Sequence, residues 1–337
     1  MNNPAKIDVS VLILFFNRPN QLQQVFDEVR KARPARLFLY QDGPRHEGDM
    51  AGVEACRKIV DNIDWECDVH RNYQTVNSGC DPSGFLAQKW AFSLTDKCIV
   101  LEDDCVPSQS FFPFCKEMLD RYEHDERIVL ISGMNHEECT SYCPYDYFFA
   151  TTFSIWGWAS WRRVISQYDE HYTCLDDPYS RGRFSELIKE RKYRKYYIRQ
   201  CEENRKSGIA HFESILHIVM FFNNGLSIVP SRNMINNVGL TADSTHYAVQ
   251  FDTLPRAIRR LFTMKRFEYT PPIQHPPYVI EDVEYKNTMF RIMGWGHPWL
   301  KIGRSFEELW LNIWHGDFSR ITEAVRHRLG KWRKKGL

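Results

Sequence analysis

The stretch VSVLILFF, from Val9 to Phe16, is the longest apolar run near the start of the chain. β-Branched and aromatic residues dominate it, and such a run is typical of a strand covered on both faces of a sheet. Pro19 follows, where its missing N–H favours the start of a helix. A secretory h-region is the alternative, but neither a basic n-region nor a small-residue cleavage site frames the run. We therefore predict a buried strand.

Working outward from that stretch, strand and helix patterns alternate through the first half of the chain. Short apolar runs predict further strands at 37–40, 66–71, 98–101 and 128–132. Helical patterns lie between them at 19–29, 50–61, 82–94 and 108–122. Strands separated by helices predict an open, mostly parallel α/β sheet with right-handed crossovers.

The second half has a different pattern. A long charged stretch at 184–207 and an apolar stretch at 213–222 predict helices, and a turn then leads to a strand at 226–229. From about residue 255 onward the pattern becomes irregular and contains two Pro-Pro pairs. No internal repeat is evident.

The composition limits the class of protein. With 337 residues, 43% of them hydrophobic, and a formal net charge of +1, the chain resembles an ordinary globular protein. This excludes a disordered chain, a collagen and a small disulfide scaffold. No apolar run approaches the roughly 20 residues that span a bilayer. The ten cysteines include no CxxC pair, so we expect free thiols in a reducing cytosol rather than a zinc site.

Basic residues gather toward the C-terminus. Residues 251–337 hold 16 Lys and Arg against 9 Asp and Glu, an excess of +7, and residues 319–337 hold seven against one, an excess of +6. An apolar stripe at helical spacing runs through Phe318, Ile321, Val325, Leu329 and Trp332. The apolar residues of 306–313 have the same spacing. A basic amphipathic helix with tryptophan suits an anionic membrane surface, here through 318–337. The alternative is that both helices pack on the domain.

Polar residues follow three of the predicted strands. They are Asn17-Arg18, Asp42-Gly43 and Glu102-Asp103-Asp104. Ligands of open α/β sheets bind at the carboxyl ends of the strands. Adjacent carboxylates repel one another unless a cation binds, and hard oxygen ligands suit Mg²⁺ or Mn²⁺ bridging a diphosphate. The alternatives are an acidic surface turn, a charge at the start of a helix and an ordinary Asp-Gly turn.

A series of motifs carries a resemblance. In order, the chain has a strand and Asn17-Arg-Pro, a strand and Gln41-Asp-Gly, then Cys98-Ile-Val-Leu-Glu-Asp-Asp before Pro-Ser-x-Ser-Phe-Phe, then Ile131-Ser-Gly-Met-Asn and Gly157-Trp. Together they resemble the metal-dependent nucleotide-sugar glycosyltransferases of the GT-A fold, above all the N-acetylglucosaminyltransferase I type and its bacterial relatives. The resemblance covers about residues 8–250.

The resemblance implies roles for the strand-end residues. Asp104, the last carboxylate of the DxD-type motif, would bind Mn²⁺, and Asp103 would reach the ribose and the metal shell. Glu102 would hydrogen-bond the donor sugar. Arg18, beside Asn17, would contact the nucleotide, and Asp42, beside Gly43, would bind uracil. The segment 237–246 would close over the diphosphate through Ser244, Thr245 and His246.

The resemblance also implies a catalytic base at Glu213. The family places there a carboxylate that follows an aromatic residue and starts a helix, as Phe212-Glu213 does, although this chain has Glu where Asp is expected. Asp169 and Asp243 are rival carboxylates, and helix-start chemistry is the alternative role for Glu213. Trp156, Trp158, Trp161 and Phe212 are candidates to contact a sugar, with core packing as the alternative for the tryptophans.

These observations predict a GT-A (Rossmann-like) domain at 1–254, with a nucleotide-binding half at 8–135 and an acceptor half at 136–254. A basic, Trp-rich extension follows at 255–337 and is predicted to be helical. We expect an inverting, Mn²⁺- or Mg²⁺-dependent transfer from a nucleoside-diphosphate sugar to a glycan or lipid-linked acceptor. The expected location is the cytoplasm, peripheral on the inner face of the membrane, with no nucleic acid partner. The alternatives are a sugar-nucleotide nucleotidyltransferase and a non-enzymatic membrane-binding or cytolytic protein.

Overall fold

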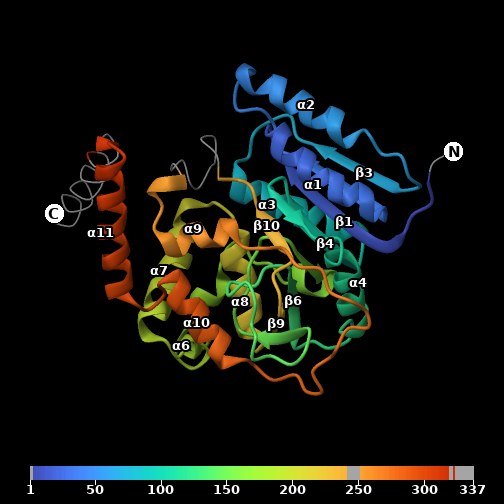
Figure 1. The fold of residues 1–337 in the computed structure, drawn as a ribbon. Helices are drawn as coiled ribbons and strands as arrows, with labels where there is room; N and C mark the ends of the chain where they lie inside the picture. The colour runs from blue at the N-terminus through green and yellow to red at the C-terminus, as the bar shows by residue number, and fades with distance from the viewer. Residues whose placement is uncertain (1–2, 241–250, 319–321, 323–337) are drawn as a thin grey trace.

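A twisted sheet with helices around it forms the body of the molecule in the computed structural model, which describes residues 3–240, 251–318 and 322 (Figure 1). The strands are β1 (Ile7–Phe15), β2 (Pro34–Gln41), β3 (Asp68–Tyr73), β4 (Lys97–Glu102), β5 (Cys105–Pro107), β6 (Ile128–Ser132), β7 (Tyr147–Ala150), β8 (Trp158–Trp161), β9 (Leu226–Pro230) and β10 (Ile235–Asn237). The helices are α1 (Pro19–Ala32), α2 (Met50–Val60), α3 (Cys80–Leu94), α4 (Phe111–Arg121), α5 (Arg162–Ile165), α6 (Pro178–Leu187), α7 (Arg191–Ser207), α8 (Phe212–Phe222), α9 (Arg256–Thr263), α10 (Val283–Met293) and α11 (Pro298–Trp314).

The main sheet has eight strands in the order β3-β2-β1-β4-β8-β6-β9-β7. The first four are parallel, and β6 pairs parallel with β9. Helices flank this sheet and a helical segment ends the described chain (Figure 1). The predicted fold class, a mostly parallel, Rossmann-like α/β sheet with a C-terminal helical extension, is therefore confirmed.

The strand β1 has the double-sided burial expected of its sequence. Val11, Leu12 and Ile13 are all fully buried between β2 and β4. On one face of the sheet, Phe38 and Tyr40 of β2 contact the ring of Trp90 on α3, at 5.5 and 6.3 Å between ring centres. The helices α1 and α2 pack together over the β1–β3 part of the sheet (Figure 1).

One antiparallel strand divides the parallel sheet. The strand β8 lies between β4 and β6 and runs antiparallel to both, and β7 closes the far edge antiparallel to β9. A separate two-stranded ribbon pairs β10 with β5. These four short strands were not predicted, because three or four residues carry too little periodicity to be distinguished from loops.

Two parts of the second half differ from the expectation. The charged stretch at 184–207 belongs to two helices, α6 and α7, which are separated where Ile188 inserts into the core. The described region after residue 255 contains the helices predicted for the extension, but its irregular sequence pattern did not indicate α9 or α10, and residues 264–282 hold no helix. Its helix α10 packs on the sheet edge, where the Tyr285 ring lies 4.8 Å from that of Phe148 and the Asp282 N–H donates to the Phe149 carbonyl at 2.7 Å.

The cysteines and the C-terminal apolar stripe were also predicted from the sequence. All ten cysteines are free thiols, as predicted. Of the stripe predicted at 318–332 only Phe318 has a described side chain, and it is exposed; the others lie outside the described residues. Among the described residues, no helix is both long and apolar enough to cross a membrane.

Candidate active site

The carboxyl ends of the parallel strands form one wall of a cleft. The strands β1, β2 and β4 end level with one another, because Phe15 pairs with Gln41 and Leu14 pairs with Glu102. With the first turns of α1 and α3 they enclose a cleft of about 690 Å³, which Phe212 at the start of α8 closes on one side. The predicted site residues that line it are Asn17, Arg18, Asp42, Glu102, Asp103 and Phe212.

Three consecutive carboxylates and one guanidinium form a cluster at this cleft, which Arg18, Glu102 and Asp103 line and Asp104 does not. Glu102 ends β4, and Asp103 and Asp104 form the turn that leads into β5. Arg18, at the start of α1, donates hydrogen bonds from its Nη2 to Asp103 Oδ1 and, at 2.9 Å, to Asp104 Oδ2. The two aspartates are only 3% and 7% exposed. With every group ionised, this cluster carries two more negative charges than positive ones.

The cluster shifts the pKa values of its own members. Burial raises the pKa of Glu102, and repulsion from Asp104 and Asp103 adds to that rise. Burial also raises the pKa of Asp103, against the attraction of Arg18. Burial alone would lower the pKa of Arg18, but the two aspartates outweigh it and raise that pKa. A bound cation would relieve this excess of negative charge.

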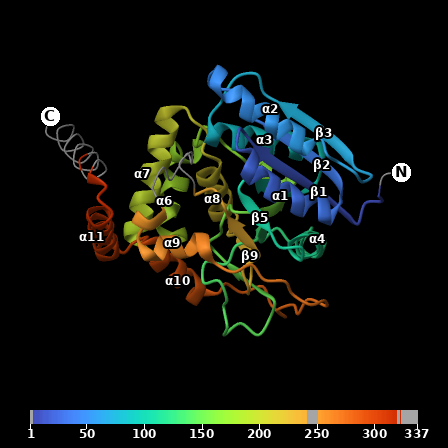
Figure 2. The same ribbon diagram turned by 45° about the horizontal axis from the view of Figure 1, so that its top comes forward.

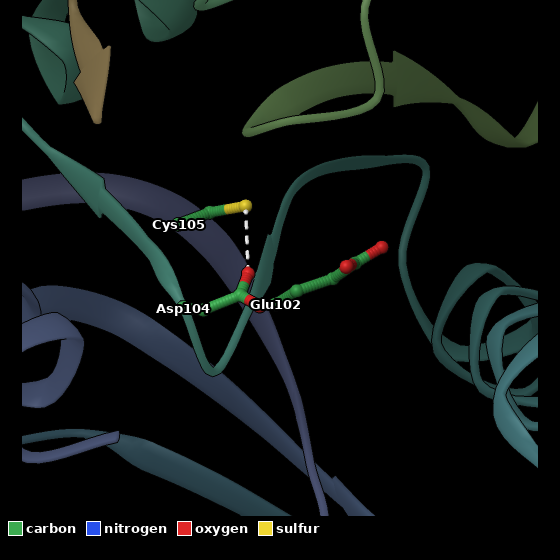
Figure 3. A group of neighbouring side chains, drawn as sticks. All are labelled: Glu102, Asp104 and Cys105. Atoms are coloured by element: carbon green, nitrogen blue, oxygen red, sulfur yellow. Dashed lines mark hydrogen bonds between the residues drawn. The ribbon is translucent and has the colours of Figure 1, made fainter. Parts of the chain in front are cut away.

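The donor set fits a hard divalent cation. Glu102, Asp104 and Cys105 place one ligand atom each within 4.8 Å of one another (Figure 3). Cys105 Sγ faces Asp104 and lies 3.4 Å from its Oδ1. Burial, followed by the charges of Asp104 and Glu102, raises the pKa of the Cys105 thiol well above its usual value, so with no cation bound this group is a neutral thiol. The two carboxylates suit Mg²⁺ or Mn²⁺.

Asp103 has a different environment from its two neighbours. Its carboxylate is held by Arg18 and accepts a hydrogen bond from the Phe16 N–H at 3.4 Å. Arg18 binds both Asp103 and Asp104, but the described group of side chains that could hold a metal ion contains Glu102, Asp104 and Cys105 and not Asp103. The expectation that Asp103 also binds the metal remains a prediction.

A distant segment of the chain forms the back of the acidic cluster. Because β10 pairs with β5, Asn237 lies opposite Cys105 and donates from Nδ2 to Asp104 Oδ1 at 3.1 Å. The Val238 N–H donates to the Asp104 carbonyl at 2.8 Å. A Cβ on Gly239 would lie 2.0 Å from Asp104 Oδ2, so any other residue there would have to displace that carboxylate. The predicted contacts Ser244, Thr245 and His246, and the rival base Asp243, lie outside the described residues.

Asp42 holds the loop before α3. Its two oxygens accept hydrogen bonds from Asn77 Nδ2 at 2.9 Å and from the backbone N–H groups of Gly43, Ser78 and Gly79 at 2.9 to 3.0 Å. A carboxylate has about four acceptor positions, so these donors fill it. For Asp42 to bind uracil, as the resemblance implies, one of these donors would have to leave. Gly43 allows the close passage of this loop, because a Cβ there would lie 2.4 Å from the Val76 backbone.

The Asp49 carboxylate holds Asn17 in place. Asn17 Nδ2 donates to Asp49 Oδ1 at 2.7 Å, and Arg45 forms a bidentate pair with the same carboxylate at 2.8 and 3.0 Å. The hydrogen bonds from Arg45 hold the pKa of Asp49 far below its usual range. Asn17, Arg45 and Asp49 all line the cleft, so this network fixes its rim.

Two hydroxyl groups on the cleft wall were not foreseen. Tyr40 of β2 and Ser83 of α3 are 1% and 7% exposed and line the cleft. They lie near each other, but among the described residues neither hydroxyl has a partner at full hydrogen-bonding geometry. Burial, with the charge of Asp42 second, raises the pKa of Tyr40 to about 12, so its hydroxyl stays a neutral donor. Buried polar groups are normally paired, and a ligand in the cleft can complete them.

Glu213 lies in the first turn of α8, beside α3. The neighbouring His211 Nδ1 is 3.2 Å from Asp81 Oδ2, and a Cβ on Gly84 would lie 2.7 Å from the Phe212 ring, so the two helices meet closely. Part of the Glu213 side chain is exposed to solvent. Desolvation by the protein atoms around its carboxyl group, followed by repulsion from Asp81, raises its pKa. The charge of Glu213 also contributes to the raised pKa of Glu102, so the two carboxylates are electrostatically coupled.

The rival carboxylate Asp169 has a structural role. It accepts hydrogen bonds from the Thr173 N–H at 2.6 Å and from the His171 N–H at 3.0 Å. Burial alone would raise its pKa, but the hydrogen bonds from Thr173 outweigh this and lower it. Asp169 does not line the cleft. Glu213 does not line the cleft either, but it directly follows Phe212, which does, and of these two described carboxylates it is therefore the better candidate base.

The tryptophans differ in exposure. Trp158 and Trp161 belong to the central strand β8 and are 1% and 2% exposed within the main core. Trp156 is half-buried and packs its ring 5.0 Å from that of Phe262. Core packing therefore accounts for Trp158 and Trp161, and of the predicted aromatic sugar contacts only Phe212 lines the cleft.

Helix N-termini surround the cleft. Arg18, Gly79 and His211 precede the first turns of α1, α3 and α8, and none of these three residues makes a side-chain capping hydrogen bond. The first N–H groups of a helix have no partner within the helix and carry partial positive charge, which favours a bound anion. Positive helix ends thus lie beside a negative cluster, an arrangement suited to an anion bridged by a cation.

Comparisons with known proteins identify no family. No protein family and no curated protein matches the sequence. Among solved structures, the inositol-1-phosphate CTP transferase from T. maritima is similar to this chain with a TM-score of 0.29 and 12% identity, over 49% of this chain and 75% of that one. We draw no functional conclusion from a likeness of that size. The fold and the site together define the class: an α/β protein with an acidic cleft at the carboxyl ends of its parallel strands.

Proposed function

We propose that this chain is a metal-dependent glycosyltransferase that uses a nucleoside-diphosphate sugar. The observation that carries the proposal is the cluster of Glu102, Asp103 and Asp104 with Arg18 at the end of β4. Its two aspartates are buried, and Glu102, Asp103 and Arg18 line a cleft bordered by helix N-termini. A diphosphate needs positive charge on several sides, which helix N–H groups, a guanidinium and a divalent cation provide together. The order of motifs in the sequence supports the same assignment.

The donor would lie along the strand ends. Its diphosphate would face the starts of α1 and α3, and its nucleoside would reach the wall formed by Tyr40 and Ser83. Glu102 and Asp104 would hold Mn²⁺ or Mg²⁺, which supplies positive charge beside the diphosphate leaving group. We take UDP as the first nucleotide to test on the strength of the sequence resemblance.

Transfer would be a single displacement that inverts the anomeric carbon. Glu213 accepts the proton of an acceptor hydroxyl, whose oxygen forms the new bond to that carbon. The bond from the carbon to the diphosphate oxygen breaks, and its electron pair leaves with the nucleoside diphosphate. A raised pKa suits this role, because a base works best when its pKa is near the working pH. The acceptor would be a glycan or a lipid-linked sugar on the cytoplasmic side of a membrane.

The deciding experiment is calorimetric titration with UDP in Mn²⁺ and in chelator. Wild type is expected to bind UDP only with Mn²⁺, and Asp104→Asn is expected to lose that binding. Asp8→Asn is the matched control, because Asp8 lines a smaller cleft of about 270 Å³ at the amino ends of the strands. Equal UDP affinity of the wild type in Mn²⁺ and in chelator would contradict the proposal.

Product analysis separates the proposed enzyme from its alternative. A glycosyltransferase releases a nucleoside diphosphate from a sugar nucleotide, whereas a nucleotidyltransferase releases pyrophosphate from a nucleoside triphosphate and a sugar phosphate. Release of pyrophosphate would contradict the proposed glycosyltransferase and support the nucleotidyltransferase. If the protein binds no nucleotide with or without metal, the proposal fails and the non-enzymatic, membrane-binding protein is the alternative that remains.

A further inference from the structure

The helix α11 (Pro298–Trp314) is attached to the body by its polar side. Lys301 Nζ lies over the Tyr196 ring at 5.2 Å, and Arg304 donates to the Arg291 carbonyl at 3.1 Å. Glu307 accepts a hydrogen bond from the Arg256 N–H at 2.8 Å. Only Leu311 and Asn312 of the helix are buried. The contacts that hold α11 are therefore mainly polar.

The opposite side of α11 is apolar and faces solvent. Six large side chains at helical spacing form it, and we call them the α11 apolar face: Trp299, Ile302, Phe306, Trp310, Ile313 and Trp314. Their exposed fractions run from 45% to 81%. The rings of Trp310 and Trp314 stack on each other at 5.4 Å, and neither ring stacks on another aromatic ring among the described residues. Surface helices normally bury this side, so the orientation of α11 is the reverse of the usual one.

The position of α11 leaves this face free for a partner. Both views show α11 at the edge of the molecule, on the side away from the strands β1 to β3 (Figures 1 and 2). Soluble monomers rarely expose a contiguous apolar surface of this kind, and one that is exposed usually marks an interaction site. The question is then which partner the surroundings of the face favour.

Composition and charge favour a lipid surface. Three of the six side chains are tryptophans, which are enriched at the boundary between headgroups and acyl chains. Residues 319–337 are separated from the end of α11 by four residues and carry an excess of +6, which attracts anionic headgroups. A second copy docked face to face would bring two such segments together, and their charges would repel. A helix of 17 residues is about 25 Å long and can lie flat in the interface.

We propose that the α11 apolar face inserts into the interfacial layer of an anionic membrane and holds the protein on its surface. The basic residues beyond Phe318 add electrostatic attraction, but the apolar face supplies the anchoring contact. The proposal is independent of the proposed function, because it concerns a different surface of the molecule. It extends the sequence expectation for 318–337 to a helix whose side chains are described.

Vesicle binding tests the proposal on the full-length protein. Wild type is expected to sediment with vesicles holding about 30% anionic phosphatidylglycerol and far less with neutral ones. The double variant Phe306→Ser/Trp310→Ser is expected to lose about tenfold or more in partition coefficient, because two large apolar groups no longer insert. Tyr179→Ser is the control, since Tyr179 is 70% exposed on α6, outside α11.

A second readout separates α11 from the basic segment. Lipids with brominated acyl chains are expected to quench the fluorescence of bound wild type. The variant Trp299→Phe/Trp310→Phe/Trp314→Phe should bind nearly as well and lose most of that quenching. Undiminished binding of the double variant would overturn the proposal in favour of the basic segment alone. A lipid-free dimer that the double variant abolishes would overturn it in favour of a second copy.

Discussion

Single residues set the geometry of the acidic cluster, and Gly239 is the tightest of them. It passes so close to Asp104 that the carboxylate and a Cβ cannot coexist. This contact joins the segment that follows β10 to the turn between β4 and β5. The candidate metal ligand is thus positioned by a residue that is 135 positions away in the sequence.

Gly239→Ala is expected to displace the Asp104 carboxylate and to lower Mn²⁺-dependent UDP affinity by about tenfold or more, equivalent to about 1.4 kcal/mol. Gly182→Ala is the matched control, because a Cβ there meets nothing within 4 Å. In the helix α6 that substitution should be neutral or stabilising. Calorimetric titration of both variants with UDP and Mn²⁺ makes the comparison. Equal UDP affinities would show that Gly239 does not contribute to the site.

Among the elements, the loop before α3 depends on one side-chain amide. Asn77 Nδ2 donates both to Asp42 Oδ2 at 2.9 Å and to the Gly43 carbonyl at 2.8 Å. These bonds tie the loop to the end of β2. They also place the start of α3, and with it Ser83, at the wall of the cleft.

Asn77→Asp removes both donors and sets a second carboxylate beside Asp42. We expect a loss of about 1–3 kcal/mol in the free energy of unfolding, with weaker nucleotide binding, since a buried acceptor loses its partner and meets a like charge. Asn62→Asp is the control, because that exposed amide, just after α2, donates to the Lys58 carbonyl at 2.9 Å. Urea unfolding of the two variants decides the point; matching midpoints would contradict it.

The sequence predicts elements better than it predicts contacts. The run at Val9–Phe16 identified β1 because a strand buried on both faces has an unmistakable composition. The strand-end residues converged as expected, since parallel strands end at one edge. The sequence could not show that hydrogen-bond donors already occupy the Asp42 carboxylate, because donors such as Asn77 and Ser78 belong to another loop. The same holds for Asn237, which reaches Asp104 only through the pairing of β10 with β5.

The sequence also did not show which tryptophans are buried and which are exposed. A Trp-rich stretch around Gly157 is compatible with a sugar site and with a core strand. Only the position of β8 between β4 and β6 shows that Trp158 is buried. On α11, the spacing of the apolar residues predicted a stripe but not that it would face outward.

At the scale of the whole molecule, two buried histidines couple stability to pH. Burial lowers the pKa of His136 and of His217 to about 4, and the Glu213 carbonyl bonded to His217 offsets this only partly. In the unfolded chain both titrate near pH 6.5. Below that pH the unfolded state binds protons that the native state does not, so stability falls as the pH drops from about 6.5 toward 4.

His217→Gln is expected to lose part of this dependence. One such histidine contributes about 2 kcal/mol to the difference in unfolding free energy between pH 7 and pH 5. The measurement is urea unfolding at both pH values for wild type, His217→Gln and the control His171→Gln, whose side chain is 80% exposed. A variant with the same pH dependence as wild type would show that His217 is protonated in the native state.

The insertion of β8 between β4 and β6 also has a consequence for synthesis on the ribosome. The first four strands of the sheet, β3-β2-β1-β4, are complete once residue 102 has been made, but β4 keeps an open edge until residues 158–161 arrive. The strand β6 is made in the interval and cannot join the sheet without β8. Unpaired apolar edges are templates for aggregation. The nascent chain must therefore protect one strand edge while more than 50 further residues are added.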